Sequence, residues 1–147
     1  MIKTMECEIL NILEFDITRP TPLDFLRRYS RAADNTDQAH ITARYLIEMA
    51  TMNSIFMTKK VSLLAAGAVY LGRCMCRNEP YWDETMAFYS GYSENDLIEI
   101  AHTLNDFNAF MQSPQNKYTK IQEKYSDDLH QHVSTLPPCD DIIFSFH

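Results

Sequence analysis

The sequence predicts an all-α protein, and three observations support this prediction. Apolar residues recur at three- and four-residue spacing over most of the 147 positions, which is the period of an amphipathic helix. Only three glycines and six prolines occur, fewer than many short strands joined by tight turns would need. Eight Met, eight Phe and eight Tyr suit helices that pack through bulky side chains. Because 46% of the residues are hydrophobic, we expect a single folded domain with a substantial core.

The chain begins with a predicted helix and a proline-containing connector. Isoleucines and leucines form a broad apolar stripe over 2–13. Pro20 and Pro22 then impose an extended segment, because proline disfavours helical backbone in the residue before it. Thr21 offers a hydroxyl cap and Pro22 a first helical position, so the next helix begins there. Helices are expected over 22–33, 37–53, 59–76, 83–90 and 94–112, followed by a polar helix over 115–126.

The helix over 59–76, with Thr58 as its cap, is the predicted centre of the fold. No charged residue lies between Leu63 and Val69. A helix that is apolar on every face is a buried helix. Its alanines and glycine leave room for neighbouring backbones to approach closely, so we expect other helices to pack around it.

Polar residues and a glycine mark the boundaries of the later helices. Asp83 is a cap for 83–90, and Gly91 closes that helix in a left-handed conformation. Ser93 begins the next helix, and Ser113 with Pro114 ends it. After a proline-containing stretch around 134–138, we expect an irregular tail.

Composition argues against several classes of partner. Thirteen Lys and Arg against 20 Asp and Glu give a net charge of −7, which disfavours binding to nucleic acid. The apolar stretch 63–71 is far shorter than the ~20 residues of a membrane span, and Glu6 and Glu8 stand where a signal peptide needs an apolar run. We therefore predict a protein of the nucleus and cytoplasm with reduced cysteines and with neither a nucleic-acid nor a membrane partner.

The pattern that most resembles a catalytic site is Glu99-x-x-His102, echoed by Asp37-x-x-His40. Two such pairs, with further inward carboxylates, build di-metal sites in helical bundles. Three-residue spacing is nevertheless common by chance, and the helix dipole favours an acid such as Asp37 in a first turn. Neither a Gly-rich phosphate loop nor a Gly-x-Ser-x-Gly motif occurs. We interpret these residues as ordinary surface and boundary positions and predict no metal, no cofactor and no enzymatic activity.

Arg27, Arg28 and Arg31 form the one dense positive patch of the sequence. One interpretation is a solvated helix face. The other is a docking site for an acidic or phosphorylated protein, because guanidinium forks match the oxygens of a phosphate group. Both interpretations stay open at this point.

The order and spacing of several motifs resemble those of a mitotic cyclin, most closely the B type. The resemblance runs from about residue 5 to residue 137 and begins at the boundary between the two helical boxes of that family. The motifs are Arg19-Pro20-x-Pro22-x-x-Phe25-Leu26-Arg27-Arg28, Ala43-x-Tyr45-Leu46-x-Glu48, Ala65-Ala66-Gly67-Ala68, Trp82, Gly91-Tyr92-Ser93-x-x-Asp96-Leu97 and Glu123-Lys124-Tyr125.

The resemblance implies a five-helix cyclin box around a buried central third helix, with one preceding helix. By this interpretation, 1–14 is the last helix of an otherwise absent N-terminal box, and 15–21 is a linker. Residues 22–136 form the C-terminal box and 137–147 a tail.

The resemblance also implies a partner, because members of the family bind a cyclin-dependent serine/threonine kinase and carry no chemistry of their own. Glu6 corresponds to an acidic residue that pairs with a lysine of the first box and meets the kinase. Leu10 and Ile17 correspond to apolar positions that face the kinase. The helix with that lysine is not in this sequence, so we do not expect activation by this chain alone.

The predicted function is therefore that of a cyclin-like regulatory subunit or fragment in mitotic control. Two alternatives remain. One is a cyclin-fold module of the kind found in transcription factors, and the other is a helical di-metal enzyme that uses Glu99 and His102.

Overall fold

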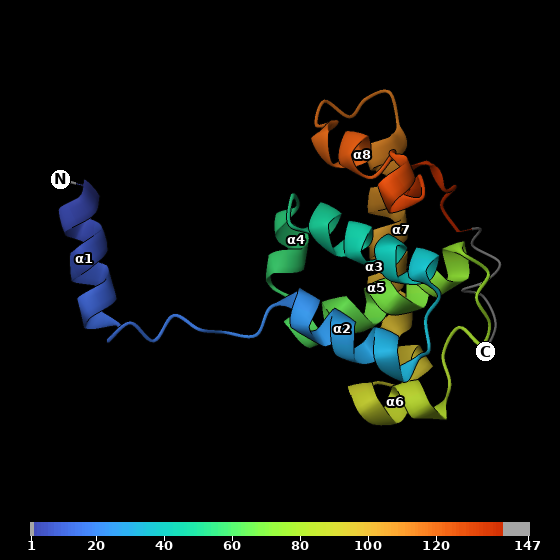
Figure 1. Ribbon diagram of the computed structural model, residues 1–147, viewed down its shortest axis with the longest axis horizontal. Coiled ribbons are helices and arrows are strands. Elements are labelled where there is room, and N and C mark those ends of the chain that lie inside the picture. The colour runs from blue at the N-terminus through green and yellow to red at the C-terminus, as the bar shows by residue number, and fades with distance from the viewer. Residues whose placement is uncertain (1, 140–147) are drawn as a thin grey trace.

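The computed structural model describes residues 2–139, and no strand occurs among them, which confirms the prediction of an all-α fold. Figure 1 shows the helices in chain order: α1 (Ile2–Ile12), α2 (Pro22–Ala32), α3 (Asp37–Ala50), α4 (Ser54–Met57), α5 (Val61–Met75), α6 (Glu84–Ser90), α7 (Glu94–Gln112) and α8 (Lys120–Lys124), then the 3-10 turns η1 (Asp128–His130) and η2 (Val133–Thr135). Within this part of the chain, no helix has the length and hydropathy to cross a membrane. Positions 140–147 of the predicted tail lie outside the described residues.

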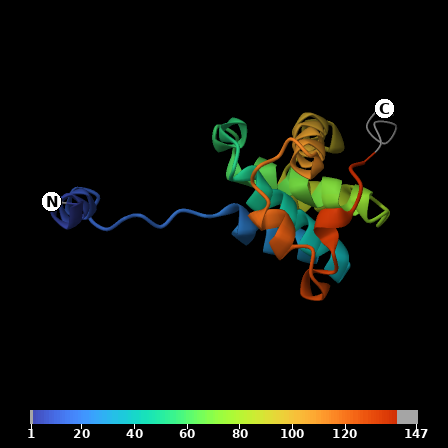
Figure 2. The ribbon, with the colours of Figure 1, turned by 90° about the horizontal axis from the view of Figure 1, so that it is seen from above.

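The central helix of the fold is α5, as the absence of charge in its middle predicts. Every residue from Leu64 to Cys74 is buried. Helices α2 and α3 pack on one side of α5 and α7 on the other (Figure 2). The hydrophobic core therefore surrounds one helix, and α2, α3 and α7 each contribute an apolar face to it.

Two glycines of α5 determine how closely the neighbouring helices approach. A Cβ atom on Gly67 would lie 2.5 Å from Cγ2 of Ile100 in α7. A Cβ atom on Gly72 would lie 3.1 Å from the backbone nitrogen of Ala43 in α3. Since interiors are close-packed, these positions have no room for a larger residue. The predicted close approach of neighbouring helices is confirmed.

The predicted helix boundaries hold at the starts of α2, α6 and α7 and at the ends of α6 and α7. The backbone N–H of Thr21 donates to Oδ2 of Asp24 at 2.9 Å, and the two residues form a capping box at the start of α2. Ser93 begins α7 in the same way. The carboxylate of Asp83 accepts a backbone N–H in the first turn of α6, and Gly91, with φ 75°, closes that helix.

The helix predicted over 37–53 is too long, because α3 ends earlier and a short separate helix follows. The side chain of Asn53 accepts the backbone N–H of Ile55 at 3.1 Å, and this cap begins α4. Thr58 is not the cap of the central helix. It ends α4 instead, where its hydroxyl donates to the carbonyl of Ile55 at 3.2 Å.

The polar helix predicted over 115–126 is also too long, since only α8 forms there. The side-chain amide of Asn116 donates to the carbonyls of Met111 and Tyr118, at 2.9 Å and 3.0 Å. Such local bonds from side chain to backbone compete with the hydrogen bonds of a helix. Tyr118 is consequently 67% exposed, whereas Tyr125 is fully buried.

A polar cluster holds α8 and the residue after it against α3. Nζ of Lys124 lies 2.7 Å from Oε1 of Glu48, and the hydroxyl of Tyr125 donates to Oε2 of Glu48 at 2.7 Å. Partial burial raises the pKa of Glu48, but the hydrogen bonds from Lys124 and Tyr125 and the charge of Arg44 outweigh it and lower that pKa below its ordinary value. Glu48 is therefore ionised at neutral pH and serves as the anchor of this cluster.

The buried Arg73 of α5 connects three segments of the chain. Its Nη1 donates to the carbonyl of Ala33 at 2.8 Å and to Oδ1 of Asn35 at 2.6 Å. Its Nε donates to the carbonyl of Pro80 at 2.8 Å. Ala33 ends α2 and Pro80 lies in the segment that leads to α6, so this side chain fixes α2 relative to the approach to α6.

Candidate functional site

The first predicted site lies on α1 and on the connector after it. Glu6 is exposed on α1, Leu10 is half-buried, and Ile17 in the connector is 61% exposed. The connector is extended, and α1 stands clear of the other helices (Figure 1). The structure thus places these three residues along one continuous segment outside the core.

Helix α1 has an apolar face that nothing in the described chain covers. None of its residues is buried. The large apolar side chains exposed on α1 and the connector are Ile2, Met5, Ile9, Ile12, Leu13, Phe15 and Ile17. An isolated helix of 11 residues is marginal in water, and an exposed apolar patch is typical of an interaction surface. This segment is therefore a candidate binding surface for another protein.

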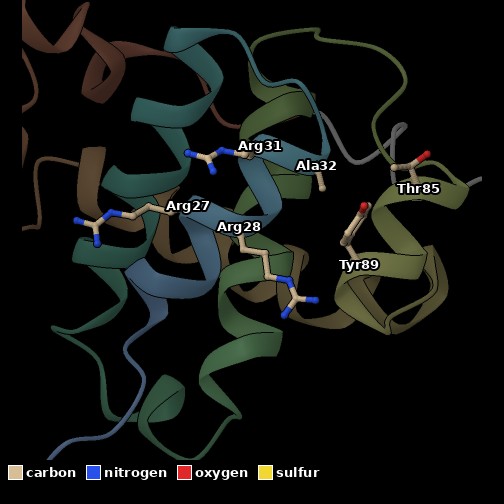
Figure 3. A pocket seen from close by; sticks show the side chains of 6 residues that line it. All are labelled: Arg27, Arg28, Arg31, Ala32, Thr85 and Tyr89. Carbon is tan, nitrogen blue, oxygen red and sulfur yellow. The ribbon is translucent and has the colours of Figure 1, made fainter.

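The second predicted site, the arginine patch, lies on the outer face of α2. Leu26 and Tyr29 on the inner face are buried in the core, which fixes the orientation of the helix. The patch belongs to a surface pocket of about 640 Å³ (Figure 3). The residues that line this pocket are Arg27, Arg28, Arg31, Ala32, Thr85 and Tyr89. The fold thus joins the patch to side chains of α6, which are not among the residues predicted from the sequence.

The three arginines have different surroundings. Arg28 extends toward Tyr89 of α6, whereas Arg27 and Arg31 extend to the opposite side of α2 in the view of Figure 3. Arg27 forms an ion pair with Asp24 at 3.7 Å. Among residues 2–139, no ion pair involves Arg28 or Arg31. Arg28 is accordingly the charge most directly available to the pocket between α2 and α6.

Two further hollows lie between α2 and α3. One, of about 390 Å³, contains Arg31 together with two aspartates. The other, of about 110 Å³, contains Arg27, His40 and Arg44. Burial, and then the charge of Arg44, lower the pKa of His40. Arg44 is not among the predicted site residues because it belongs to another helix than the arginine patch, and its only signal in the sequence is a charge on the outer face of the predicted helix 37–53.

The residues of the di-metal alternative have other partners in the structure. Nζ of Lys59 lies 3.0 Å from Oε1 of Glu99. Nδ1 of His40 lies 2.9 Å from the hydroxyl of Ser30. Within residues 2–139, no group of three or more His, Cys, Asp and Glu is placed to hold a metal ion. The structure does not favour the di-metal alternative.

The fold defines a class of protein, namely a helical domain around a buried central helix, with two candidate binding surfaces outside the core. The profile of the family described as "Cyclin, C-terminal domain" matches residues 20–139. The chain therefore belongs to the cyclin family.

Curated relatives support the same assignment. A G2/mitotic-specific cyclin of Glycine max is 36% identical over 137 residues, which cover 93% of this chain and 30% of that protein. A G2/mitotic-specific cyclin-B of Hydra vulgaris is 34% identical over 92% of this chain and 37% of its own length. Cyclin-B1-4 of Arabidopsis thaliana is 35% identical over 98% of this chain and 37% of its own length. The resemblance to B-type mitotic cyclins is confirmed, and the chain spans about a third of the length of these relatives.

Proposed function

We propose that this chain is a regulatory, non-enzymatic subunit that binds a cyclin-dependent serine/threonine kinase in mitotic control, in the nucleus and the cytoplasm. The observation that carries the proposal is the similarity, over at least 92% of this chain, to proteins named mitotic cyclins. The uncovered apolar face of α1 adds support, because it offers a partner a hydrophobic surface.

The proposed kinase contacts are Glu6, Leu10 and Ile17. Full burial of an exposed aliphatic side chain such as Ile17 contributes about 1.5–3 kcal/mol to binding. Glu6 would contribute little affinity as a solvated charge, but a charge within an apolar stripe specifies register. A partner on α1 would also stabilise a helix that is too short to be stable alone.

The experiment is retention of the intact chain on immobilised cyclin-dependent kinases, with Glu8→Ala as the matched control for Glu6→Ala on the same helix. We expect the wild-type chain to be retained and Glu8→Ala to leave retention unchanged. Glu6→Ala should weaken retention only slightly, because Glu6 specifies the register of the contact and adds little affinity. Replacement of both Leu10 and Ile17 by alanine should abolish retention. A wild-type chain that none of the kinases retains would overturn the proposal.

Phosphorylation of a histone substrate then separates two forms of the proposal. An increase in kinase activity on addition of the chain would define an activator. Retention without any increase would define a docking partner or a competitor of longer cyclins.

The two alternatives predict different results. A cyclin-fold transcription-factor-like module would bind DNA with a steep dependence on salt concentration, which the net charge of −7 opposes. A di-metal enzyme that uses Glu99 and His102 would carry stoichiometric iron or manganese in elemental analysis. The relatives favour neither alternative.

A further inference from the structure

One face of α1 carries large apolar side chains that are exposed and follow the three- and four-residue spacing of a helical stripe. They are Ile2, Met5, Ile9 and Ile12. At about 100° per residue, Glu6 and Glu8 border this stripe on its two sides. Leu10 lies to one side of the stripe and Ile17 lies beyond the helix, so a contact made through the stripe is independent of the proposed kinase contact.

A second exposed apolar surface surrounds the short helix α4. Its large apolar side chains are Met52, Ile55, Met57 and Val61. Figures 1 and 2 both show α4 at the end of the domain that faces α1. Lys60 is exposed on this segment, and no ion pair within residues 2–139 involves it, whereas Lys59 is paired with Glu99. The surface around α4 is therefore apolar with an adjacent positive charge, and it complements an apolar stripe bordered by carboxylates.

The turn after α1 holds this helix away from the domain in a strained backbone conformation. Glu14 and Phe15 have φ values of 50° and 57°, in the left-handed region that residues with bulky side chains rarely adopt. The backbone N–H of Phe15 donates to the carbonyl of Leu10 at 2.9 Å, so this turn sets the direction in which α1 leaves the connector. Because the left-handed conformation costs free energy, a different position of α1 is favoured wherever these two residues relax.

We propose that α1 also packs, through its apolar stripe, on the surface around α4 of the same chain, with Glu14 and Phe15 as the hinge. The connector permits this movement, because residues 13–21 span up to about 30 Å when extended and join the domain at the same end as α4 (Figure 1). Packing removes both apolar surfaces from water, which is favourable in proportion to the area buried. It also stabilises a helix of 11 residues that is marginal by itself.

The test is paramagnetic relaxation enhancement between α1 and the methionine methyl groups of the intact chain. A nitroxide is attached to Cys7, which is exposed on α1, in a chain whose two half-buried cysteines are replaced by serine. We expect the methyl signals of Met52 and Met57 to lose most of their intensity, and dilution of the sample should not restore it. Met86 belongs to α6, which lies far from α4 in Figure 1, and its signal should be unaffected.

Variants of the surface around α4 identify the contact. Ile55→Ser should weaken docking about tenfold, because it removes an apolar side chain that the contact buries. Lys60→Glu should weaken docking about twofold, as expected for an exposed charge. The matched control is Lys117→Glu, the same charge reversal at an exposed lysine between α7 and α8, which should dock as the wild type does.

The hinge has a test of its own. Replacement of both Glu14 and Phe15 by glycine removes the strain of the left-handed turn, so α1 gains less by leaving its position in Figure 1. We expect several-fold weaker docking than in Thr18→Gly, which adds a glycine to the connector at a residue without positive φ. Stronger docking in the glycine pair would contradict the assignment of the hinge.

Several outcomes would overturn the proposal. Unchanged signals of Met52 and Met57 in the nitroxide-labelled chain would mean that α1 stays clear of the domain. Loss of intensity in a mixture of nitroxide-labelled chains and separate isotope-labelled chains would assign the contact to two copies. Equal weakening by Lys60→Glu and Lys117→Glu would show general attraction between charges and not a contact at α4. An unchanged circular dichroism spectrum verifies that each variant folds.

Discussion

Replacing Arg73 by methionine keeps most of the volume of the side chain but removes its three hydrogen bonds from a site that is 3% exposed. The carbonyl of Ala33 lies on a buried residue and would lose its partner, whereas the carbonyl of Pro80 and the amide of Asn35 can be reached by water. A buried unsatisfied acceptor costs about 1–3 kcal/mol, and a hydrogen bond exchanged for water costs about 0.5–1.5 kcal/mol. We therefore expect Arg73→Met to lower the free energy of unfolding by about 3 kcal/mol.

The assay is urea unfolding followed by far-ultraviolet circular dichroism, with thermal unfolding as a second readout. A loss of about 3 kcal/mol corresponds to a Tm lower by roughly 10 °C for a chain of this size. Arg28→Met removes the same charge from an exposed position of α2 and should change stability by no more than about 0.5 kcal/mol. If Arg73→Met unfolds at the same urea concentration as Arg28→Met, the bonds of Arg73 do not stabilise the fold and the reasoning is wrong.

Three further predictions concern the core, the polar cluster and the thiols. Gly67→Ala places a methyl group against a stiff branched side chain of α7, and this overpacking should lower the free energy of unfolding by about 1–3 kcal/mol in urea titrations. The folded state lowers the pKa of Glu48 below its ordinary value of 4.5. The stability that Glu48 adds is therefore fully present above pH 4.5 and is lost as the pH falls through the lower pKa of the folded state. Glu48→Gln should flatten that part of a curve of stability against pH, and a parallel curve would contradict the role of Lys124. Iodoacetamide should modify the exposed Cys7 of the native chain well before the buried Cys74. Mass spectrometry of the digested protein measures this order, and earlier modification of Cys74 would contradict the prediction.

Helix positions could be predicted from the sequence wherever the spacing of apolar residues and the capping residues indicate the same helix boundaries. The uncharged run 63–69 predicts a buried helix because no face of it can be solvated, and α5 is buried. The break after α3 was missed because Met52 continues the apolar period of 37–53. In the structure Met52 is 41% exposed, and the cap formed by Asn53 begins a new helix. A local hydrogen bond thus ended a pattern that periodicity alone would extend.

The candidate site was predictable only in part, for the same physical reason. Arg27, Arg28 and Arg31 share one helix, so their neighbourhood follows from the helical period. Tyr89 joins them through the packing of α2 against α6, which depends on core contacts distant in sequence. Whether the apolar face of α1 is covered likewise depends on where the other segments of the chain lie. An apolar stripe predicts a helix but does not predict what packs on it.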